Sequence, residues 1–437
     1  MANVVSLYDG TTTISLVADG CLLTHYVPTA GTIEAAGSQE TVAETVEFVI
    51  TGATVATVQA KLQAISRLLG QAIEAGGSST HTAYLLLQAT DDAAVWRSEI
   101  VAFKILHDED FAAAYAQAVL GCRLIITRLA FWETMDEVDA GTVHMTNGDV
   151  AGGPAVGDWI GPAGPVTYSA TFGITEGDNA YNAGEWTAIE GVLRTPAHLR
   201  LTNEDGAPVT VKRVYIANDV YARFDGLQHA IQSGDTKSWT TSSTHATARW
   251  TLALTAAQIA KLVSGGGVRL LAVMTNISTG VYLRAQLQQV STGPVVTAAW
   301  TGPEALTSSG RLVYDLGYVQ MPPGVTTFAD WYLVITVYAG ATGSGVLDFV
   351  QFCPGGELVT LEGPGISWAD DAVIDWWGDE RYAAIDDFHA SLGAVGRLLL
   401  YPERANRLMV LVESSTGVDA TALMALQVKY RPRRATI

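Results

Sequence analysis

Apolar and polar residues alternate in short stretches along most of the chain, and turn-forming residues separate these stretches. In residues 44–50, Val46, Phe48 and Ile50 fall on one face, opposite Thr45. A period of two residues is typical of a strand that buries one face and exposes the other. The pattern therefore predicts a mainly β protein.

One segment, residues 55–75, has a different period. Its apolar residues recur every three or four positions: Val55, Val58, Leu62, Ile65, Leu69 and Ala72. Such a stripe predicts an amphipathic helix that packs on a sheet. Thr54 is suited to cap its N-terminus, and the Gly76-Gly77 pair is suited to end it.

Residues 123–133, RLIITRLAFWE, separate a segment with one predicted helix from a long segment of short predicted strands and turns. The apolar run is too short for a membrane helix and too rich in β-branched residues for a good soluble one. It predicts the last strand of an N-terminal domain, with Leu124 and Ile126 buried in the sheet. Phe131 and Trp132 are predicted to pack at the domain junction, where the β-rich remainder attaches.

The remainder reads as short strands between Gly- and Pro-rich turns, a pattern typical of β-sandwiches and jelly rolls. Residues 134–185 look loop-like, and residues 255–263 form one short helix-like interruption. The middle strands are expected at residues 248–254, 268–275, 281–290, 312–319, 331–338 and 346–352.

These patterns divide the 437 residues into regions, because one core rarely serves so long a chain. Residues 1–130 are expected to form an α+β domain of sheets plus one helix. Residues 221–356 are expected to form a jelly roll. Residues 131–220 and 357–437 are expected to be β-sandwich, either as two short domains or as one split domain with the jelly roll inserted.

The composition indicates a folded, acidic protein. Hydrophobic residues make up 49% of the chain, which excludes a disordered one. A formal net charge of -19 opposes specific binding of nucleic acid. Such a surface either maintains solubility or lines a conduit through which DNA slides without sticking.

Three isolated cysteines, Cys21, Cys122 and Cys353, form no paired motif and are expected to be small buried hydrophobic residues. The first residues lack the basic and apolar regions of a signal peptide, and no apolar run is long enough to span a bilayer. We therefore expect a soluble protein, made and assembled in a reducing cytoplasm, with no membrane partner.

The sequence contains no catalytic, cofactor-binding or metal-binding motif, and we expect neither enzyme activity nor a cofactor. Residues 107–110 are acidic, but consecutive residues cannot all face one ion, so a solvated loop is expected. An acidic group beside Trp376 and Trp377 resembles a sugar cleft in composition only: Asp370, Asp371, Asp375, Asp379 and Glu380. A glycoside hydrolase needs two carboxylates at a set separation, which the spacing does not establish.

Two further features allow binding. The tryptophans Trp239, Trp250, Trp300 and Trp331 serve either as core anchors or as platforms for sugar rings, and Trp300 and Trp331 are the candidate carbohydrate contacts. The basic end, residues 429–434, either binds an acidic neighbour or acts as a solubilising tail.

Several short segments of the sequence resemble the distal tail protein family of long-tailed bacteriophages and prophages. They are LIITRLAFWE at the junction, LRTPAHLRLTN, YDLGYVQMPPG with LDFVQFCPGG, and NRLMVLVE with the closing QVKYRPR. The order of elements before the junction resembles the family's tail-tube-like N-terminal domain. The long middle block departs from the simplest members.

This resemblance implies a virion structural protein at the tail tip, or baseplate. It implies a homo-oligomeric ring, commonly a hexamer, between the tail tube protein and the hub or tip proteins, with the tape-measure protein nearby. It also implies galectin-like or carbohydrate-module-like sandwiches that face outward. An alternative is a carbohydrate-binding adhesion module that attaches the particle to a surface glycan of the host.

Overall fold

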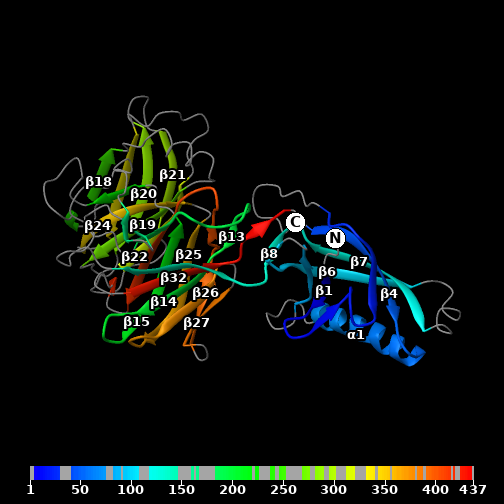
Figure 1. Ribbon diagram of the computed structural model, residues 1–437. Helices are drawn as coiled ribbons and strands as arrows, with labels where there is room; N and C mark the ends of the chain where they lie inside the picture. The colour runs from blue at the N-terminus through cyan, green and yellow to red at the C-terminus, as the bar shows by residue number, and fades with distance from the viewer. Residues whose placement is uncertain are drawn as a thin grey trace. The chain divides into compact units, whose positions relative to one another are not determined.

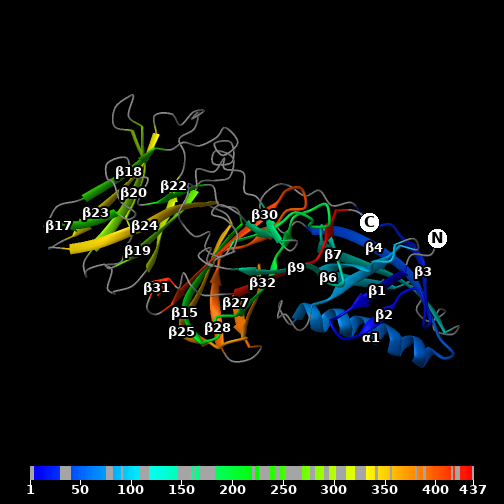
Figure 2. The ribbon, with the colours of Figure 1, turned by 60° about the vertical axis from the view of Figure 1, so that its left-hand side comes forward.

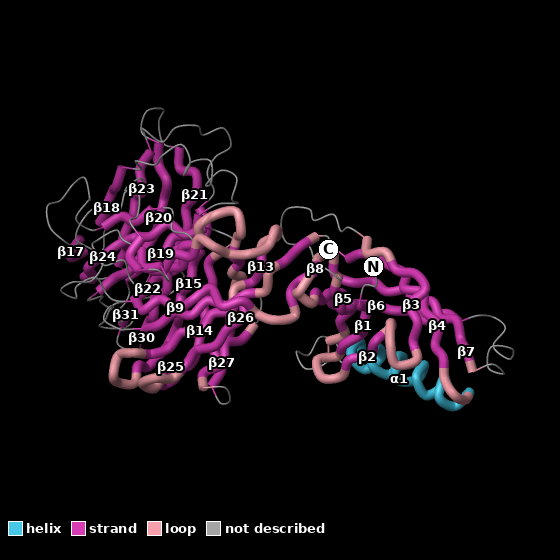
Figure 3. The backbone as a smooth tube through the Cα atoms, viewed as in Figure 1, coloured by secondary structure: helices cyan, strands magenta, loops and turns pink. Residues whose placement is uncertain are grey.

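The computed structural model describes the fold of much of the chain (Figure 1). The residues described are 4–29, 41–74, 82–89, 92–107, 118–145, 159–161, 164–166, 183–218, 222–225, 237–241, 246–251, 268–275, 281–289, 295–301, 312–319, 331–339, 343–354, 357–378, 381–386, 390–414, 417–418 and 424–435. They are mainly β-strands with one α-helix, which confirms the predicted fold class (Figure 3).

The chain divides into two compact units. Unit 1 comprises Met1–Val138, Glu190–Thr195 and Arg431–Ile437, and unit 2 comprises Asp139–Ile189 and Pro196–Tyr430. The chain therefore passes between the units four times, and its C-terminal residues belong to the same unit as its N-terminal residues.

Unit 1 is a bent sheet with a helix against it. Its elements are β1 (Val4–Tyr8), β2 (Thr13–Ser15), β3 (Cys21–Tyr26), β4 (Thr41–Thr51), α1 (Val55–Glu74), β5 (Tyr84–Gln88), β6 (Trp96–His107), β7 (Val119–Leu129), β8 (Trp132–Thr134) and β33 (Arg433–Arg434). The main strand order is β2-β1-β5-β6-β7-β4-β3, and β8 pairs with both β6 and β33. Strands β2 and β3 are thus the outermost of this order.

The helix α1 forms as the sequence predicts. Thr54 caps it, because its Oγ1 atom accepts a hydrogen bond from the Thr57 N–H at 3.3 Å. Val58, Ile65 and Leu69 are fully buried and belong to the core of unit 1. The apolar stripe therefore faces the sheet. Figure 3 shows α1 lying alongside the strands of unit 1.

One continuous sheet of 13 strands forms much of unit 2. Its strands are β9 (Val138–Met145), β10 (Trp159–Gly161), β11 (Gly164–Val166), β12 (Ala183–Trp186), β14 (His198–Asn203), β15 (Val209–Asn218), β25 (Leu358–Trp368), β26 (Val373–Trp377), β27 (Tyr382–Ile385), β28 (Ala390–Val395), β30 (Asn406–Ser414), β31 (Gly417–Val418) and β32 (Met424–Tyr430). β14 pairs with β32, and β15 pairs with β30, so segments before and after the middle block share this sheet.

The middle block of unit 2 forms two further sheets (Figure 2). One contains β16 (Ala222–Asp225), β17 (Lys237–Thr241), β19 (Val268–Thr275), β22 (Leu312–Val319) and β24 (Gly343–Pro354). The other contains β18 (Ala246–Thr251), β20 (Val281–Gln289), β21 (Val295–Thr301) and β23 (Trp331–Ala339). The short strands β13 (Thr195–Pro196) and β29 (Leu399–Leu400) complete the description.

Several expectations differ from the structure. Residues 134–185 are not all loop, because β9 to β12 lie there; their Gly-rich sequence hides short strands that pair with distant parts of the chain. Trp132, which is predicted to pack at the domain junction, lies in the short strand β8. The expected helix-like segment 255–263 and most of the acidic turn at 107–110 lie outside the described residues.

The three cysteines are buried free thiols, as the sequence predicts. No helix among the described residues has the length and hydropathy needed to cross a bilayer.

Gly378 follows β26 and is packed against backbone on two sides. Its N–H donates to the Ala197 carbonyl at 2.6 Å, and its carbonyl accepts from the Leu398 N–H at 2.9 Å. A Cβ atom at this position would overlap the Leu398 carbonyl oxygen. We expect Gly378→Ala to lower the free energy of unfolding of unit 2 by about 2 kcal/mol, as measured by urea denaturation.

Gly393 provides the matched control for this prediction. A Cβ atom added there would meet only the Glu362 carbonyl oxygen, at 3.8 Å. Gly393→Ala should therefore change the free energy of unfolding by less than about 1 kcal/mol. Equal losses for the two alanine variants would contradict the role assigned to the packing of Gly378.

Candidate functional site

The C-terminal residues of the chain complete the sheet of unit 1. In the pairing of β33 with β8, Arg433 lies opposite Glu133 and Arg434 lies opposite Trp132. The Thr134 N–H donates to the Pro432 carbonyl at 3.1 Å. The end of the chain is therefore hydrogen-bonded to the residues that follow the junction strand β7.

A second segment that belongs to unit 1, Glu190–Thr195, is hydrogen-bonded to the backbone of Arg433. The N–H groups of Val192 and Leu193 donate to the Arg433 carbonyl at 2.9 and 3.1 Å. Gly191 has a φ of +115°, and a Cβ atom there would lie 3.0 Å from the Arg433 nitrogen. Glycine is needed at this position because the two backbones approach so closely.

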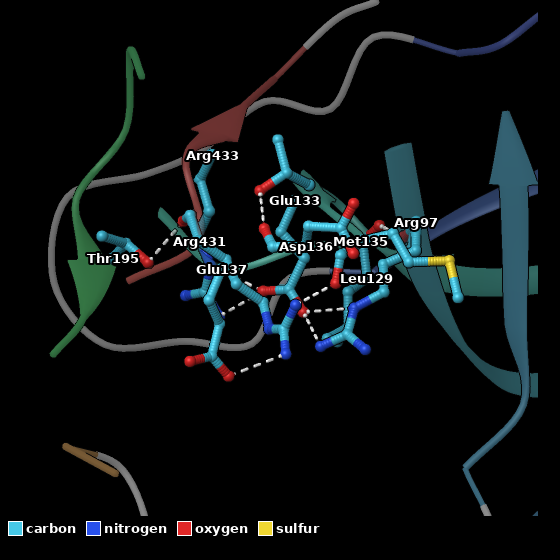
Figure 4. Close-up of polar contacts among 11 residues, drawn as sticks. Arg97, Leu129, Glu133, Met135, Asp136, Glu137, Thr195, Arg431 and Arg433 are labelled. Carbon is cyan, nitrogen blue, oxygen red and sulfur yellow. Dashed lines mark hydrogen bonds and ion pairs between the residues drawn. The ribbon is translucent and has the colours of Figure 1, made fainter. Parts of the chain in front are cut away.

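The carboxylate of Glu133 lies between two guanidinium groups (Figure 4). Arg97 Nη2 donates to Glu133 Oε1 at 2.8 Å, and Arg433 Nη2 donates to Glu133 Oε2 at 2.9 Å. The Nε atoms of both arginines also donate to these oxygens, at 3.0 and 3.1 Å. The side chains of all three residues are 12–16% exposed, so the cluster is largely removed from water.

Two aromatic rings flank this cluster. The Arg97 guanidinium lies 4.5 Å from the centre of the Tyr84 ring, and the Arg433 guanidinium lies 4.0 Å from the centre of the Phe131 ring. Each cation thus contacts a carboxylate and the electron-rich face of a ring. We name Arg97, Glu133 and Arg433 the Glu133 cluster.

The charge of Glu133 depends on its two partners. Burial raises the pKa of Glu133, but the charges of Arg433 and Arg97 outweigh burial, and the pKa lies below its usual value of 4.5. The unfolded carboxyl group therefore binds its proton at higher pH than the folded one. The stabilisation is fully present above the usual pKa and is lost as the pH falls through the folded-state pKa.

We expect unit 1 to lose more stability on acidification in the wild type than in Glu133→Gln. Urea denaturation at about pH 7 and about pH 4 measures the two differences. The gap in free energy of unfolding between wild type and variant should narrow at the lower pH. A gap that stays constant or widens would contradict this assignment of the pKa.

Arg431 adds a second point of attachment beside the cluster. Its Nη1 atom donates to the Met135 carbonyl, and its Nη2 atom lies 3.0 Å from Glu137 Oε1. The Thr195 hydroxyl donates to the Arg431 carbonyl at 2.8 Å. Burial and the nearby charge of Arg97 lower the pKa of Arg431, and the acidic partner opposes this change.

Arg434 contacts the start of β6 and the residues just before it, at a more exposed position. Its guanidinium lies 4.2 Å from the centre of the Trp96 ring and its Nη1 atom lies 3.6 Å from Asp92 Oδ2. The Trp96 Nε1–H donates to the same oxygen at 2.8 Å. Arg434 therefore extends the contact surface but, at 45% exposure, stabilises it less.

A separate ion pair lies in the core beneath β8. Arg128 on β7 and Glu44 on β4 are both 0% exposed, and Arg128 Nη2 lies 2.5 Å from Glu44 Oε1. The Tyr26 hydroxyl and the Thr29 N–H donate to the same carboxylate at 2.8 and 2.7 Å. The Arg128 guanidinium also lies 4.3 Å from the centre of the Trp132 ring. The pair thus connects the neighbouring strands β4 and β7 to the start of β8.

These contacts attach the C-terminal residues Arg431, Arg433 and Arg434 to the rest of unit 1. Each guanidinium meets a carboxylate within unit 1, and no side chain of the group is arranged as a nucleophile with a base. In the described part of the chain, no group of His, Cys, Asp and Glu side chains is arranged to hold a metal ion. The arrangement holds residues 431–434 against the sheet of unit 1.

The residues predicted at the junction lie in and beside this site. Leu124, Ile126 and Trp132 are 0% exposed and belong to the core of unit 1. Phe131 is half-buried beneath Arg433. Of the two alternatives for the basic end, the structure shows Arg431, Arg433 and Arg434 paired with acidic residues of the same chain: Glu137, Glu133 and Asp92.

The other predicted residues do not join one site. Trp300 lies in β21 opposite Ala285, and Trp331 lies in β23 opposite Gln289; their side chains lie outside what the structure describes. Trp376 is buried in the core of unit 2. Asp370 accepts a hydrogen bond in a turn, and Asp375 pairs with a histidine. Two further acids, Asp379 and Glu380, lie outside the described residues.

Comparisons with known proteins give distant structural matches only. No protein-family model and no curated protein sequence matches the chain. The Dit protein of phage SPP1, described as a hub of the adsorption apparatus in phages that infect Gram-positive hosts, is 10% identical, with a TM-score of 0.21 over 81% of this chain and 99% of that one. A chain of the phage P2 baseplate in its activated, calcium-bound conformation is 8% identical, with a TM-score of 0.25 over 84% of this chain and 100% of that one. A chain of infectious bursal disease virus, Gt strain, has a TM-score of 0.15 and 10% identity over 69% of this chain and 82% of that one. TM-scores of this size are too low to establish a shared fold.

Proposed function

We propose that the chain is a non-catalytic structural protein of a phage tail tip. In this role it forms a homo-oligomeric ring, with six copies as the expected number, that joins the tail tube to the tip or baseplate. The observation that carries the proposal is the return of the C-terminal residues into the sheet of unit 1. A subunit in which the distant strands β8 and β33 are paired in one sheet suits a permanent assembly that bears load.

The edges of the unit 1 sheet support a ring. Among the described strands, β2 and β3 each pair on one side only. Leu22 on β3 is 60% exposed, and Val27 just beyond it is 64% exposed. Open edges with apolar side chains favour pairing with a further copy, and head-to-tail pairing closes into a ring when the rotation permits.

Two features of the sequence support the place in the particle. The sequence segments around the junction and at the end of the chain resemble distal tail proteins. They include FWE (residues 131–133) and KYRPR (residues 429–433), which contain Glu133, Arg431 and Arg433. The net charge of -19 suits a lumen that passes DNA without binding it. The tail tube protein, the tip proteins and the tape-measure protein are the partners that this proposal implies.

Light scattering of the purified chain tests ring formation. We expect a mass of several times 46.3 kDa for the wild type. Leu22→Lys should reduce it toward one chain, because a lysine on an open edge opposes pairing. Val192→Lys is the matched control, since Val192 is 63% exposed but does not lie on β2 or β3. A wild-type mass of one chain at every concentration would contradict the proposal.

A further inference from the structure

The outward face of four neighbouring strands in unit 2 carries aromatic and charged side chains side by side. The strands are β27, β26, β14 and β32, in that order. Their inward side chains, such as Leu199, Ile374 and Val428, are fully buried. Successive residues of a strand face opposite ways, so the side chains between them point outward.

The first row across this face is aromatic at one end and cationic at the other. His198 on β14 lies opposite Trp377 on β26 and opposite Lys429 on β32. The rings of His198 and Trp377 stack, with centroids 4.2 Å apart and an interplanar angle of 16°. Tyr382 on β27 is 65% exposed. Asp375 pairs with Ala384 in the hairpin of β26 and β27. The same register, continued by two residues toward the turn, places Tyr382 opposite Trp377.

The second row is polar. Arg200 on β14 lies opposite Asp375 on β26 and opposite Gln427 on β32. Asp375 Oδ1 forms a short hydrogen bond with His198 Nε2, and Asp375 Oδ2 lies 3.4 Å from Arg200 Nε. Burial raises the pKa of Asp375, but His198 and Arg200 outweigh burial, and the pKa lies below its usual range. The carboxylate therefore fixes the imidazole and the guanidinium in place.

The charges of this face differ from those of the chain as a whole. Arg200, Lys429 and His198 surround the Asp375 carboxylate, and a second carboxylate, that of Asp139 on β9, accepts a hydrogen bond from Gln427 at 2.6 Å. The whole chain, by contrast, carries a formal charge of -19. Within the described residues, no carboxylate forms an ion pair with the Lys429 ammonium. The face therefore complements an anion.

The same geometry excludes two other kinds of ligand. A peptide cannot add as a strand here, because β26, β14 and β32 have paired neighbours on both sides. Lysine and aspartate are depleted at protein interfaces, and both Lys429 and Asp375 lie on this face, which opposes a protein partner. Flat rings beside fixed hydrogen-bonding groups suit a sugar, whose apolar face stacks on a ring while its hydroxyl groups meet polar side chains.

We propose that this outward face binds an acidic saccharide chain. One sugar ring stacks on Tyr382 and the edge of Trp377, and its carboxylate or phosphate pairs with Lys429 and Arg200. The site lies on one sheet of a single chain, so it does not depend on the proposed ring, and the two can fail separately.

Binding of uronic-acid oligosaccharides to the full chain tests the proposal, with carboxyl-reduced forms of the same oligosaccharides as neutral probes. Calorimetry or biolayer interferometry measures the affinity. We expect Tyr382→Ala and Lys429→Gln each to weaken binding of the acidic probe about tenfold, and added salt to weaken it further. Tyr318→Ala is the matched control, because Tyr318 is 50% exposed but lies on β22, away from this face.

Each result decides one part of the proposal. Equal affinity for acidic and neutral probes would overturn the assignment of an anionic ligand. Loss of affinity in Tyr318→Ala but not in Tyr382→Ala would overturn the location. Absence of binding to every saccharide probe, by a chain with the wild-type circular dichroism spectrum, would overturn the site. This holds even if the chain still binds a protein partner.

Discussion

Replacing Arg128 with methionine is expected to lower the free energy of unfolding of unit 1 by about 4 kcal/mol. Arg128 and Glu44 are both fully buried. Methionine keeps much of the apolar volume but leaves the Glu44 carboxylate in the core without its counter-charge. The Tyr26 hydroxyl and the Thr29 N–H still donate to it, but neither carries a positive charge. Urea denaturation followed by tryptophan fluorescence measures the loss.

A second pair on the same two strands provides the control. Arg123 on β7 and Glu47 on β4 lie 2.9 Å apart, but their side chains are 58% and 36% exposed. Arg123→Met should cost less than about 1 kcal/mol, because water and salt screen an exposed pair. The double variant Arg128→Met with Glu44→Gln should recover part of the loss, since both charges are then removed. Equal losses at Arg128 and Arg123 would contradict the role of burial.

Glu133→Gln is expected to lower the free energy of unfolding of unit 1 by about 3 kcal/mol. The change leaves Arg97 and Arg433, both largely buried, with like charges and no carboxylate between them. Hydrogen exchange should show faster exchange at β33 than in the wild type, because the pairing of β8 with β33 loses its ionic contact. Denaturation and hydrogen exchange of the same samples measure both effects.

Glu137→Gln separates the Glu133 cluster from a general effect of charge. Glu137 pairs with Arg431, and its side chain is 24% exposed. We expect a loss of less than about 1 kcal/mol and little change in exchange at β33. If Glu137→Gln costs as much as Glu133→Gln, the cluster does not fix the end of the chain in the way we describe.

Local patterns were enough to predict some of this molecule. The three- and four-residue spacing from Val55 to Ala72 predicts α1, and Thr54 caps it as its position indicates. Alternation in residues 44–50 predicts the buried face of β4. These features depend on residues only a few positions apart in the sequence, so local periodicity is enough to predict them.

The buried ion pair was partly visible in the same patterns. Glu44 shares a face with Val46 and Phe48, and Arg128 shares a face with Ile126. An acid and a base on the buried faces of two strands need each other, but only the pairing of β4 with β7 places Glu44 opposite Ile126 and next to Arg128. Single-strand periodicity does not contain that register.

The Glu133 cluster could not be predicted from local patterns. Arg433 and Glu133 are 300 positions apart in the chain, and β33 has only two residues. The basic end allowed two readings because its partners are set by the return of the chain into unit 1. The face around His198 was missed for the same reason, since β14, β26 and β32 come from distant parts of the sequence.

The most direct test of the proposed function is a cryo-electron microscopy reconstruction of purified tailed particles whose genome encodes this chain. We predict a ring of copies at the distal end of the tail tube, with unit 1 in contact with its neighbours through the edges of its sheet. Complete particles that contain no density for this chain at the tail tip would contradict the proposal.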